Sequence, residues 1–192
     1  MRIVIIDSSP SFASAARAAF AGLQGEGVEV FEGRLEEFSE EFDCVVSPCN
    51  TVGILAGNFE QTLVKLYGGE WHAEAAARIQ REHDGETTVG DAFVVERDGN
   101  GPRCVVYCAA FPRHRNSARD ATRGALSAVY EYNQGMGGGE RGRGDGEGTH
   151  APIQTVLMPG LGTFLGCPDE EAVVRDMASV AKEFMEGPGK TK

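Results

Sequence analysis

The sequence predicts a single α/β domain, a three-layer α/β/α sandwich built on a mixed, largely parallel sheet. Two observations predict this fold. Short β-branched runs alternate with segments in which apolar residues recur at helical spacing. Several of these runs are apolar at nearly every position, as strands buried on both faces are. The 192 residues contain no internal repeat and no second composition regime. We therefore expect one domain over residues 1–186 and a flexible tail at 187–192.

Six strands are expected from these runs. They are Arg2–Ile6, Val28–Glu32, Phe42–Ser47, Ala92–Glu96, Cys104–Ala109 and Ile153–Met158. A first helix should begin after Ser9, an N-cap residue that is followed by Pro10 at the first helical position. Later helical patterns start near Phe59, Trp71 and Ser117 and after Asp169. The segment at about 135–150 is rich in glycine and has few side chains that can pack, so it is expected to be a disordered surface loop.

Composition excludes several classes of protein. Acidic residues number 29 against 18 lysines and arginines, and the net charge of −11 argues against binding to a nucleic-acid backbone. No apolar run reaches the roughly 18 residues of a membrane span, and the first residues do not resemble a signal peptide. An intracellular protein, cytoplasmic or nuclear, is expected. The five cysteines form no C-x-x-C pair and lie at no metal-ligand spacing, so they are interpreted as packing thiols, with no metal and no cofactor.

Two turns between a strand and a helix have the composition of phosphate-binding loops. The first spans residues 47–58, where Asn50 follows a buried strand and Gly57 precedes a helix. Helix N-termini attract anions, Gly57 permits close backbone approach and a positive φ, and an amide can recognise a sugar diol. The alternative is structural, because Asn50 can cap a turn and Gly57 can relieve backbone strain.

The second turn spans residues 159–168, between the last strand and the last helix. Its glycines follow the pattern G-x-G-x-x-x-G, which is neither the dinucleotide fingerprint nor a Walker motif. Three glycines and a threonine in such a turn still provide a nest of backbone N–H groups for a diphosphate. Phe164 or Leu165 is placed to cover a sugar.

Together the two turns resemble those of the macro domain, an α/β/α module that binds ADP-ribose. The resemblance runs from about Val28 to Phe184. The segment ending in SPCN resembles the family's D-A-I-V-N-A-A-N, and VLMPGLGTFLGCP resembles its P-A-x-S-T-G-x-Y/F-G-x-P. The matching positions are Asp43, Val45, Val46, Asn50, Gly57 and Glu60. The added first βα unit and the S-P-x-N and P-G-L-G-T variants resemble a divergent branch of small macro-like proteins.

The resemblance implies a ligand and roles for particular residues. Asn50 would bond the distal ribose, and Glu60 would take the place of the acid that some hydrolytic members use near the scissile bond. Residues of the two loops would hold the diphosphate, namely Gly57, Asn58, Phe59, Gly160, Leu161, Gly162, Thr163 and Phe164. Where the family has an adenine-binding aspartate this chain has Arg34, which cannot accept a hydrogen bond from the adenine amino group but can stack on the base.

Three functions follow from this reasoning. The first is an enzyme that hydrolyses an ADP-ribosyl linkage, either a protein ester or ADP-ribose 1″-phosphate, with Asn50 and Glu60 as its catalytic residues. The second is a module that binds ADP-ribose or a related nucleotide without turnover. The third is a scaffold that keeps the fold for a protein partner. The expected partner is ADP-ribose or an ADP-ribosylated substrate, and neither a membrane nor a nucleic acid.

Overall fold

The computed structural model describes residues 1–112, 117–135, 151–163 and 169–187. Its strands are β1 (Arg2–Asp7), β2 (Val28–Glu32), β3 (Cys44–Asn50), β4 (Ala92–Glu96), β5 (Cys104–Phe111) and β6 (Thr155–Pro159). Its helices are α1 (Pro10–Ala19), α2 (Asn58–Tyr67), α3 (Glu70–Glu82), α4 (Ser117–Asn133) and α5 (Glu170–Glu186), and two short 3-10 turns cover Ala21–Leu23 and Leu35–Glu37.

The six strands form one sheet in the order β2-β1-β6-β3-β5-β4. Every neighbouring pair is parallel except β4 and β5, which are antiparallel. The carboxyl ends of β2, β1, β6, β3 and β5 therefore meet at one edge, which we call the carboxyl edge. The predicted mixed, largely parallel sheet is confirmed.

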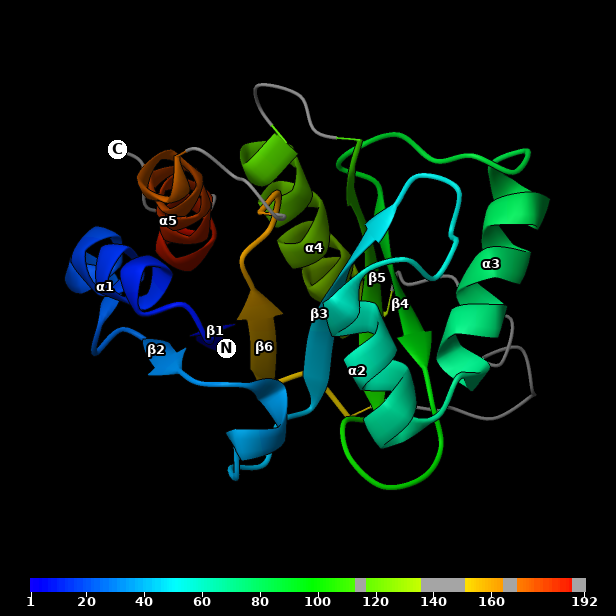
Figure 1. Cartoon of the computed structure of the whole chain (residues 1–192), viewed down its shortest axis with the longest axis horizontal. Coiled ribbons are helices and arrows are strands. Elements are labelled where there is room, and N and C mark those ends of the chain that lie inside the picture. Colours follow the sequence, from blue (N-terminus) through cyan, green and yellow to red (C-terminus); the bar gives the residue numbers. More distant parts are fainter. Residues whose placement is uncertain (113–116, 136–150, 164–168, 188–192) are drawn as a thin grey trace.

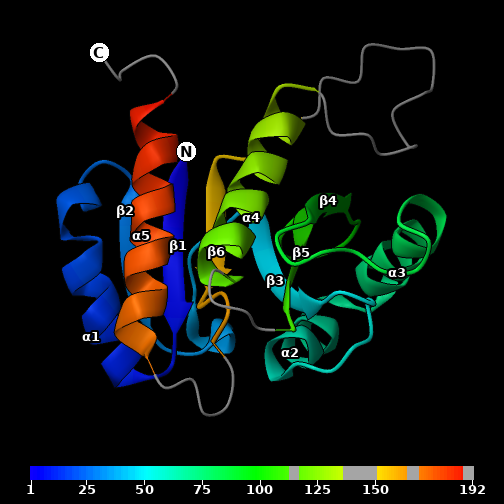
Figure 2. The ribbon, with the colours of Figure 1, turned by 90° about the horizontal axis from the view of Figure 1, so that it is seen from above.

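Helices cover both faces of the sheet. One apolar core joins alternate residues of the central strands to α1, α4 and α5, and the other joins the intervening residues to α2 and α3. Ile3 and Ile5 of β1 face the first core, whereas Val4 and Ile6 face the second. Figures 1 and 2 both show α5 between α1 and α4, with α2 and α3 at the other end of the molecule. The predicted sandwich is thus confirmed.

The predicted helix starts agree with the structure. The Ser9 hydroxyl accepts a hydrogen bond from the N–H of Phe12 at 3.3 Å, and Asp169 accepts one from the N–H of Ala172 at 2.8 Å. Both are N-cap interactions, which satisfy N–H groups that have no partner inside the helix.

Four predicted strands have other bounds in the structure: β1 extends to Asp7 and β5 to Phe111, and the differences at β3 and β6 affect both ends. The strand expected over Phe42–Ser47 is β3, Cys44–Asn50, so part of the first turn belongs to the strand. The Phe42 ring packs edge-on against Phe38 and Tyr67 and joins no ladder. The last strand likewise begins at Thr155, because Ile153, although buried, pairs through its backbone with the side chain of Asn133.

The central ladder of the sheet is incomplete toward the carboxyl edge. The pairing between β3 and β6 consists of Cys44 with Val156 and Val45 with Leu157. By contrast, β3 pairs with β5 as far as Asn50, and β6 pairs with β1 as far as Pro159. The sheet therefore opens between β3 and β6 just below the two turns that the sequence singles out.

Three predictions fall wholly or largely outside the described residues. They concern the glycine-rich segment at about 135–150, the tail at 187–192 and the side chain of Phe164. Within the described residues, no helix is long and apolar enough to cross a membrane.

Candidate functional site

The carboxyl edge collects most of the residues predicted to bind a ligand. Asn50 ends β3, Gly160 follows β6, and the N–H of Gly33, just before Arg34, donates to the carbonyl of Asp7 at the end of β1. In open α/β sheets ligands bind outside the carboxyl ends of the strands. The predicted turns span 47–58 and 159–168. Their described parts between the strands and helices, 51–57 and 160–163, lie on either side of the opening between β3 and β6.

A β-bulge sets the position of Asn50. Cys49 pairs with Ala109, but Asn50 pairs with Phe111, so β5 has one extra residue at this point. Bulges bend a strand and re-aim the side chains beside them, and they are frequent next to functional sites. The carbonyl of Asn50 accepts a hydrogen bond from the hydroxyl of Tyr107.

The side chain of Asn50 holds the first loop. Its Oδ1 accepts hydrogen bonds from the N–H groups of Val52 at 3.2 Å and Ile54 at 3.0 Å, and its Nδ2 donates to the carbonyl of Ile54. These bonds form an Asx-type turn. The turn-capping role considered for Asn50 is therefore present in this structure, and a ribose would have to replace the bonds to Ile54.

The buried hydroxyls of Thr87 and Tyr107 bond to the backbone carbonyls at the end of β3. Thr87 donates from its N–H at 2.8 Å and from its hydroxyl at 2.9 Å to the carbonyl of Thr51, and its hydroxyl lies 3.2 Å from that of Tyr107. Burial raises the pKa of Tyr107, so its hydroxyl remains a proton donor. Sequence reasoning missed both residues. The available signal was a tyrosine inside the apolar run CVVYCAA, because a buried phenol needs a partner.

Glu60 is buried at the N-terminus of α2. Only 1% of the residue is exposed, and its Oε2 accepts hydrogen bonds from the N–H groups of Gly57 at 2.8 Å and Ala56 at 3.3 Å. Its Oε1 is buried and has no hydrogen-bond partner among the residues that the structure describes. Beneath it, desolvation and the nearby charge of Glu60 raise the pKa of the Cys49 thiol well above its usual range. Glu60 thus organises the loop before α2.

The reason for a glycine at position 57 differs from the expected one. Gly57 has φ −78° and does not use the positive φ that a glycine permits; the positive φ of this loop is at Gly53, at 67°. A Cβ on Gly57 would lie 3.1 Å from Oε2 of Glu60. The glycine is needed for the close approach of that carboxylate. The next two N–H groups, of Asn58 and Phe59, belong to the first turn of α2 and have no acceptor within the helix.

The second loop is held by packing. Leu161 is completely buried, and a Cβ on Gly160 would lie 2.9 Å from the ring of Phe12. Gly162 has φ 81° and lies against the start of α4, where a Cβ would be 3.2 Å from the backbone nitrogen of Ala118. The Thr163 hydroxyl donates to the carbonyl of Gly160 at 2.9 Å. Gly160, Leu161 and Gly162 are all buried, and only Thr163 of the described part of this loop is partly exposed.

Arg34 and Asp7 lie at the outer end of the carboxyl edge. The side chain of Arg34 is 68% exposed, and its Nε lies 4.0 Å from Oε1 of Glu37. Asp7 accepts a hydrogen bond from the N–H of Ser9 at 2.8 Å. Burial, together with the charge of Glu170, raises the pKa of the Asp7 carboxyl. The face of Arg34 is free to stack on a planar group.

Solved structures with the same architecture are macrodomains. The macrodomain of Mycobacterium tuberculosis DarG matches with a TM-score of 0.58 and 19% identity, over 80% of this chain and 89% of that one. The macrodomain of Thermus aquaticus DarG matches with a TM-score of 0.56 and 14% identity, over 78% and 87%. A mutant of the Oceanobacillus iheyensis macrodomain matches with a TM-score of 0.57 and 14% identity, over 78% of this chain and 73% of that one. The chain has the macrodomain fold. No protein-family model and no curated protein sequence matches it.

The first loop of this macrodomain fold exposes three apolar side chains. Val52, Ile54 and Leu55 are 40%, 63% and 37% exposed. A cavity of about 580 Å³ lies at the opposite edge, where it is lined by residues that include Asp43 and Arg103. None of the residues predicted to bind a ligand lines that cavity.

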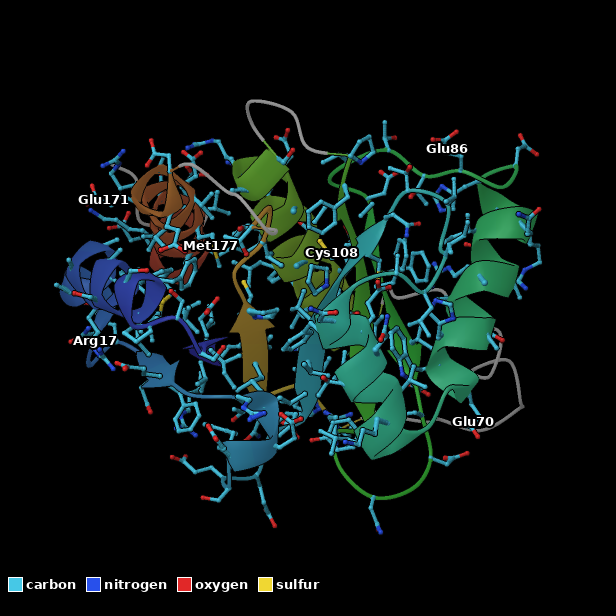
Figure 3. The ribbon with its side chains drawn as sticks, in the orientation of Figure 1. Arg17, Glu70, Glu86, Cys108, Glu171 and Met177 are labelled. Atoms are coloured by element: carbon cyan, nitrogen blue, oxygen red, sulfur yellow. The ribbon has the colours of Figure 1, made fainter. Side chains whose placement is uncertain are left out.

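The described part of this macrodomain fold offers no metal centre. No group of three or more His, Cys, Asp and Glu side chains is arranged to hold an ion among the residues outside the gaps. Cys44, Cys49, Cys104 and Cys108 are buried free thiols, as predicted for packing residues. Burial raises the pKa of Cys108 to about 12, and its thiol donates to the carbonyl of Ala121 in α4 at 3.3 Å. Cys108 is labelled in Figure 3.

Proposed function

We propose that this chain binds ADP-ribose, or a related nucleoside diphosphate-ribose, across the carboxyl edge. One observation supports this most strongly. The two turns with phosphate-loop composition follow β3 and β6, neighbouring strands whose ladder ends at Val45 and Leu157, so both turns border the same opening in the sheet. A diphosphate bound there receives backbone N–H groups from two sides.

Each part of the ligand has a counterpart at this edge. The N–H groups of Asn58 and Phe59 and the loop 160–163 bind the diphosphate, with help from the dipole of α2. Asn50 bonds the distal ribose, and Arg34 stacks on the base. The net charge of −11 does not oppose this, because backbone dipoles act locally whereas net charge governs long-range steering.

Calorimetry tests the binding proposal. We expect ADP-ribose to bind more tightly than ADP or NAD, and an oligo-adenylate not to bind. Asn50→Ala should weaken ADP-ribose binding about tenfold, the cost of losing hydrogen bonds to the ribose. Asn100→Ala, on an exposed loop at the other end of the sheet, is the matched control and should have no effect. Failure of ADP-ribose to bind would overturn the proposal, whatever the other three ligands do.

We further propose that the bound linkage is hydrolysed, as a protein ester or as ADP-ribose 1″-phosphate. Water adds to the anomeric carbon or to phosphorus, the bond to the leaving oxygen breaks, and the leaving group takes up a proton. Oε1 of Glu60 is the free atom that can accept the proton of the water. Because Glu60 is 1% exposed, the loop 51–57 must open for water to reach it.

Two substitutions at Glu60 separate proton transfer from loop organisation. Both N–H groups bond to a single oxygen of Glu60, so the amide oxygen of Glu60→Gln can keep these bonds while the base is lost. If Glu60 is the base, both Glu60→Gln and Glu60→Ala should lower the rate of product release at least a hundredfold. If Glu60→Gln retains activity and Glu60→Ala does not, the glutamate acts by shaping the loop.

Binding without turnover is the second candidate, and the burial of Glu60 favours it. The carboxylate is fully engaged with the loop through one oxygen, and its other oxygen is enclosed. Tight binding of ADP-ribose with no product from an ADP-ribosylated protein or from ADP-ribose 1″-phosphate would establish this candidate and exclude hydrolysis.

A further inference from the structure

We propose that Tyr107 and Thr87 are positioning residues for Asn50, and that they set the affinity for the distal sugar of the ligand. This inference rests on the proposed binding of ADP-ribose. It adds two residues, from β5 and from the loop after α3, that do not contact the ligand themselves.

The hydroxyl of Tyr107 fixes the backbone of Asn50. The bulge in β5 shifts the register opposite Asn50, and the carbonyl of Asn50 accepts a hydrogen bond from the hydroxyl of Tyr107. Tyr107 is 1% exposed, so water does not compete for this bond. Its ring stacks on Phe93, with 4.8 Å between the ring centroids and 19° between the planes. The ring is therefore held independently of the hydroxyl.

Thr87 fixes the following residue. Its N–H and its hydroxyl both donate to the carbonyl of Thr51, and the hydroxyl of Thr51 donates to Glu86 at 3.1 Å. Figure 3 shows Glu86 near the loop that follows α3. Residues 50 and 51 are thus tied to a segment more than thirty residues further along the chain. The hydroxyls of Thr87 and Tyr107 lie 3.2 Å apart, so the two supports are adjacent, and we call them together the network.

This network acts on ligand affinity through geometry. The direction of the Asn50 side chain depends on the backbone dihedral angles at residues 50 and 51, which the network restrains. A binding group must be held within about half an ångström of its working position by the residues around it. Loss of either hydroxyl should therefore weaken the contacts of Asn50 and leave contacts made by other residues intact.

Tyr107→Phe tests the proposal with two ligands. ADP-ribose contains the distal ribose that Asn50 would bond, and ADP lacks it. We expect Tyr107→Phe to weaken ADP-ribose binding about tenfold and ADP binding less than twofold. Tyr130→Phe, at an exposed position of α4, is the matched control and should change neither. Thr87→Val, which removes the hydroxyl, should weaken ADP-ribose binding as Tyr107→Phe does. Thr87→Ser, which keeps the hydroxyl, should bind ADP-ribose as the unsubstituted protein does.

A double-mutant cycle completes the test. In an Asn50→Ala background, Tyr107→Phe should have no further effect on ADP-ribose binding, because the group that it positions is absent. An equal loss for ADP and ADP-ribose, an unchanged affinity, or additive effects of the two substitutions would overturn the inference. If the unsubstituted protein binds ADP-ribose and only the variants fail these expectations, the inference is wrong and the proposed function stands. If the unsubstituted protein does not bind ADP-ribose, both are overturned.

Discussion

The two loops at the carboxyl edge are held by different forces. The first, 51–57, is fastened by hydrogen bonds from the side chains of Asn50 and Glu60, and it exposes most of its apolar side chains. The second, 160–163, is fastened by packing, with Leu161 in the core and Gly162 against α4. Hydrogen bonds to a loop can be exchanged one for one with a ligand, whereas a buried side chain cannot be withdrawn without opening a cavity. The first loop is therefore the one that can rearrange when a ligand binds.

Truncation at the centre of the packed loop should have the largest effect. Leu161→Ala removes a fully buried side chain and should lower the free energy of unfolding by about 3 kcal/mol. Ile54→Ala, in the first loop, removes a side chain that is 63% exposed and should change it by less than about 0.5 kcal/mol. Urea unfolding of the two variants measures both values. Similar costs at the two positions would show that the loops are held in the same way.

Substitution of Asn50 should have an intermediate effect that is confined to the first loop. Asn50→Ala removes the bonds to Val52 and Ile54 and should cost about 1 kcal/mol. Amide hydrogen exchange should then accelerate at residues 52–54 and stay unchanged at 160–163. Asn50→Asp keeps the two acceptor bonds and should retain most of the protection. Faster exchange in both loops would contradict the independence of their supports.

The smallest expected effect is a change in stability with pH that depends on Asp7 at the end of β1. The pKa of Asp7 is raised above its ordinary value of 3.8 by burial, so protonated Asp7 favours the folded state. Its stabilisation is complete below about pH 4 and is lost as the pH rises through the raised pKa. As the pH rises through the raised pKa, the Asp7→Asn variant should therefore become more stable relative to the unsubstituted protein.

Glu29→Gln provides the opposite case for this titration. Arg2 lowers the pKa of Glu29, so its stabilisation is present above the ordinary pKa of 4.5 and is lost as the pH falls. Between pH 3 and pH 7, the melting temperature relative to the unsubstituted protein should rise for Asp7→Asn and fall for Glu29→Gln. Parallel pH profiles would show that the burial of Asp7 has no net cost.

The sequence was sufficient for the local features of the fold. Ser9 and Asp169 identify helix starts by chemistry that acts over three residues, and the buried strands are evident from their continuous apolar runs. Strand ends were predicted less well, because the end of β3 depends on where its partner β5 stops pairing. Ladder length is a property of two segments and cannot be derived from one.

The candidate site was predictable only in outline. The positions of the two turns along the chain follow from the alternation of strands and helices. That the turns lie side by side follows from the pairing of β3 with β6, which the structure shows. The burial of Glu60 and the bonds that join Tyr107 and Thr87 to residues 50 and 51 depend on contacts between distant segments. The crowding of position 57 by the Glu60 carboxylate, 3.1 Å from where a Cβ would lie, is likewise a contact that the sequence does not reveal.

The carboxylate at the start of α2 also bears on how many negative charges a ligand can bring. Oε2 of Glu60 already occupies the first N–H groups that this helix end offers. An incoming phosphate at the next N–H groups lies close to a fixed negative charge, and repulsion grows with each charge it carries. A phosphate esterified on both sides carries one charge, whereas a terminal phosphate carries up to two. This end of the helix should therefore discriminate against mononucleotides with a free terminal phosphate and favour a diphosphate capped by a sugar at each end.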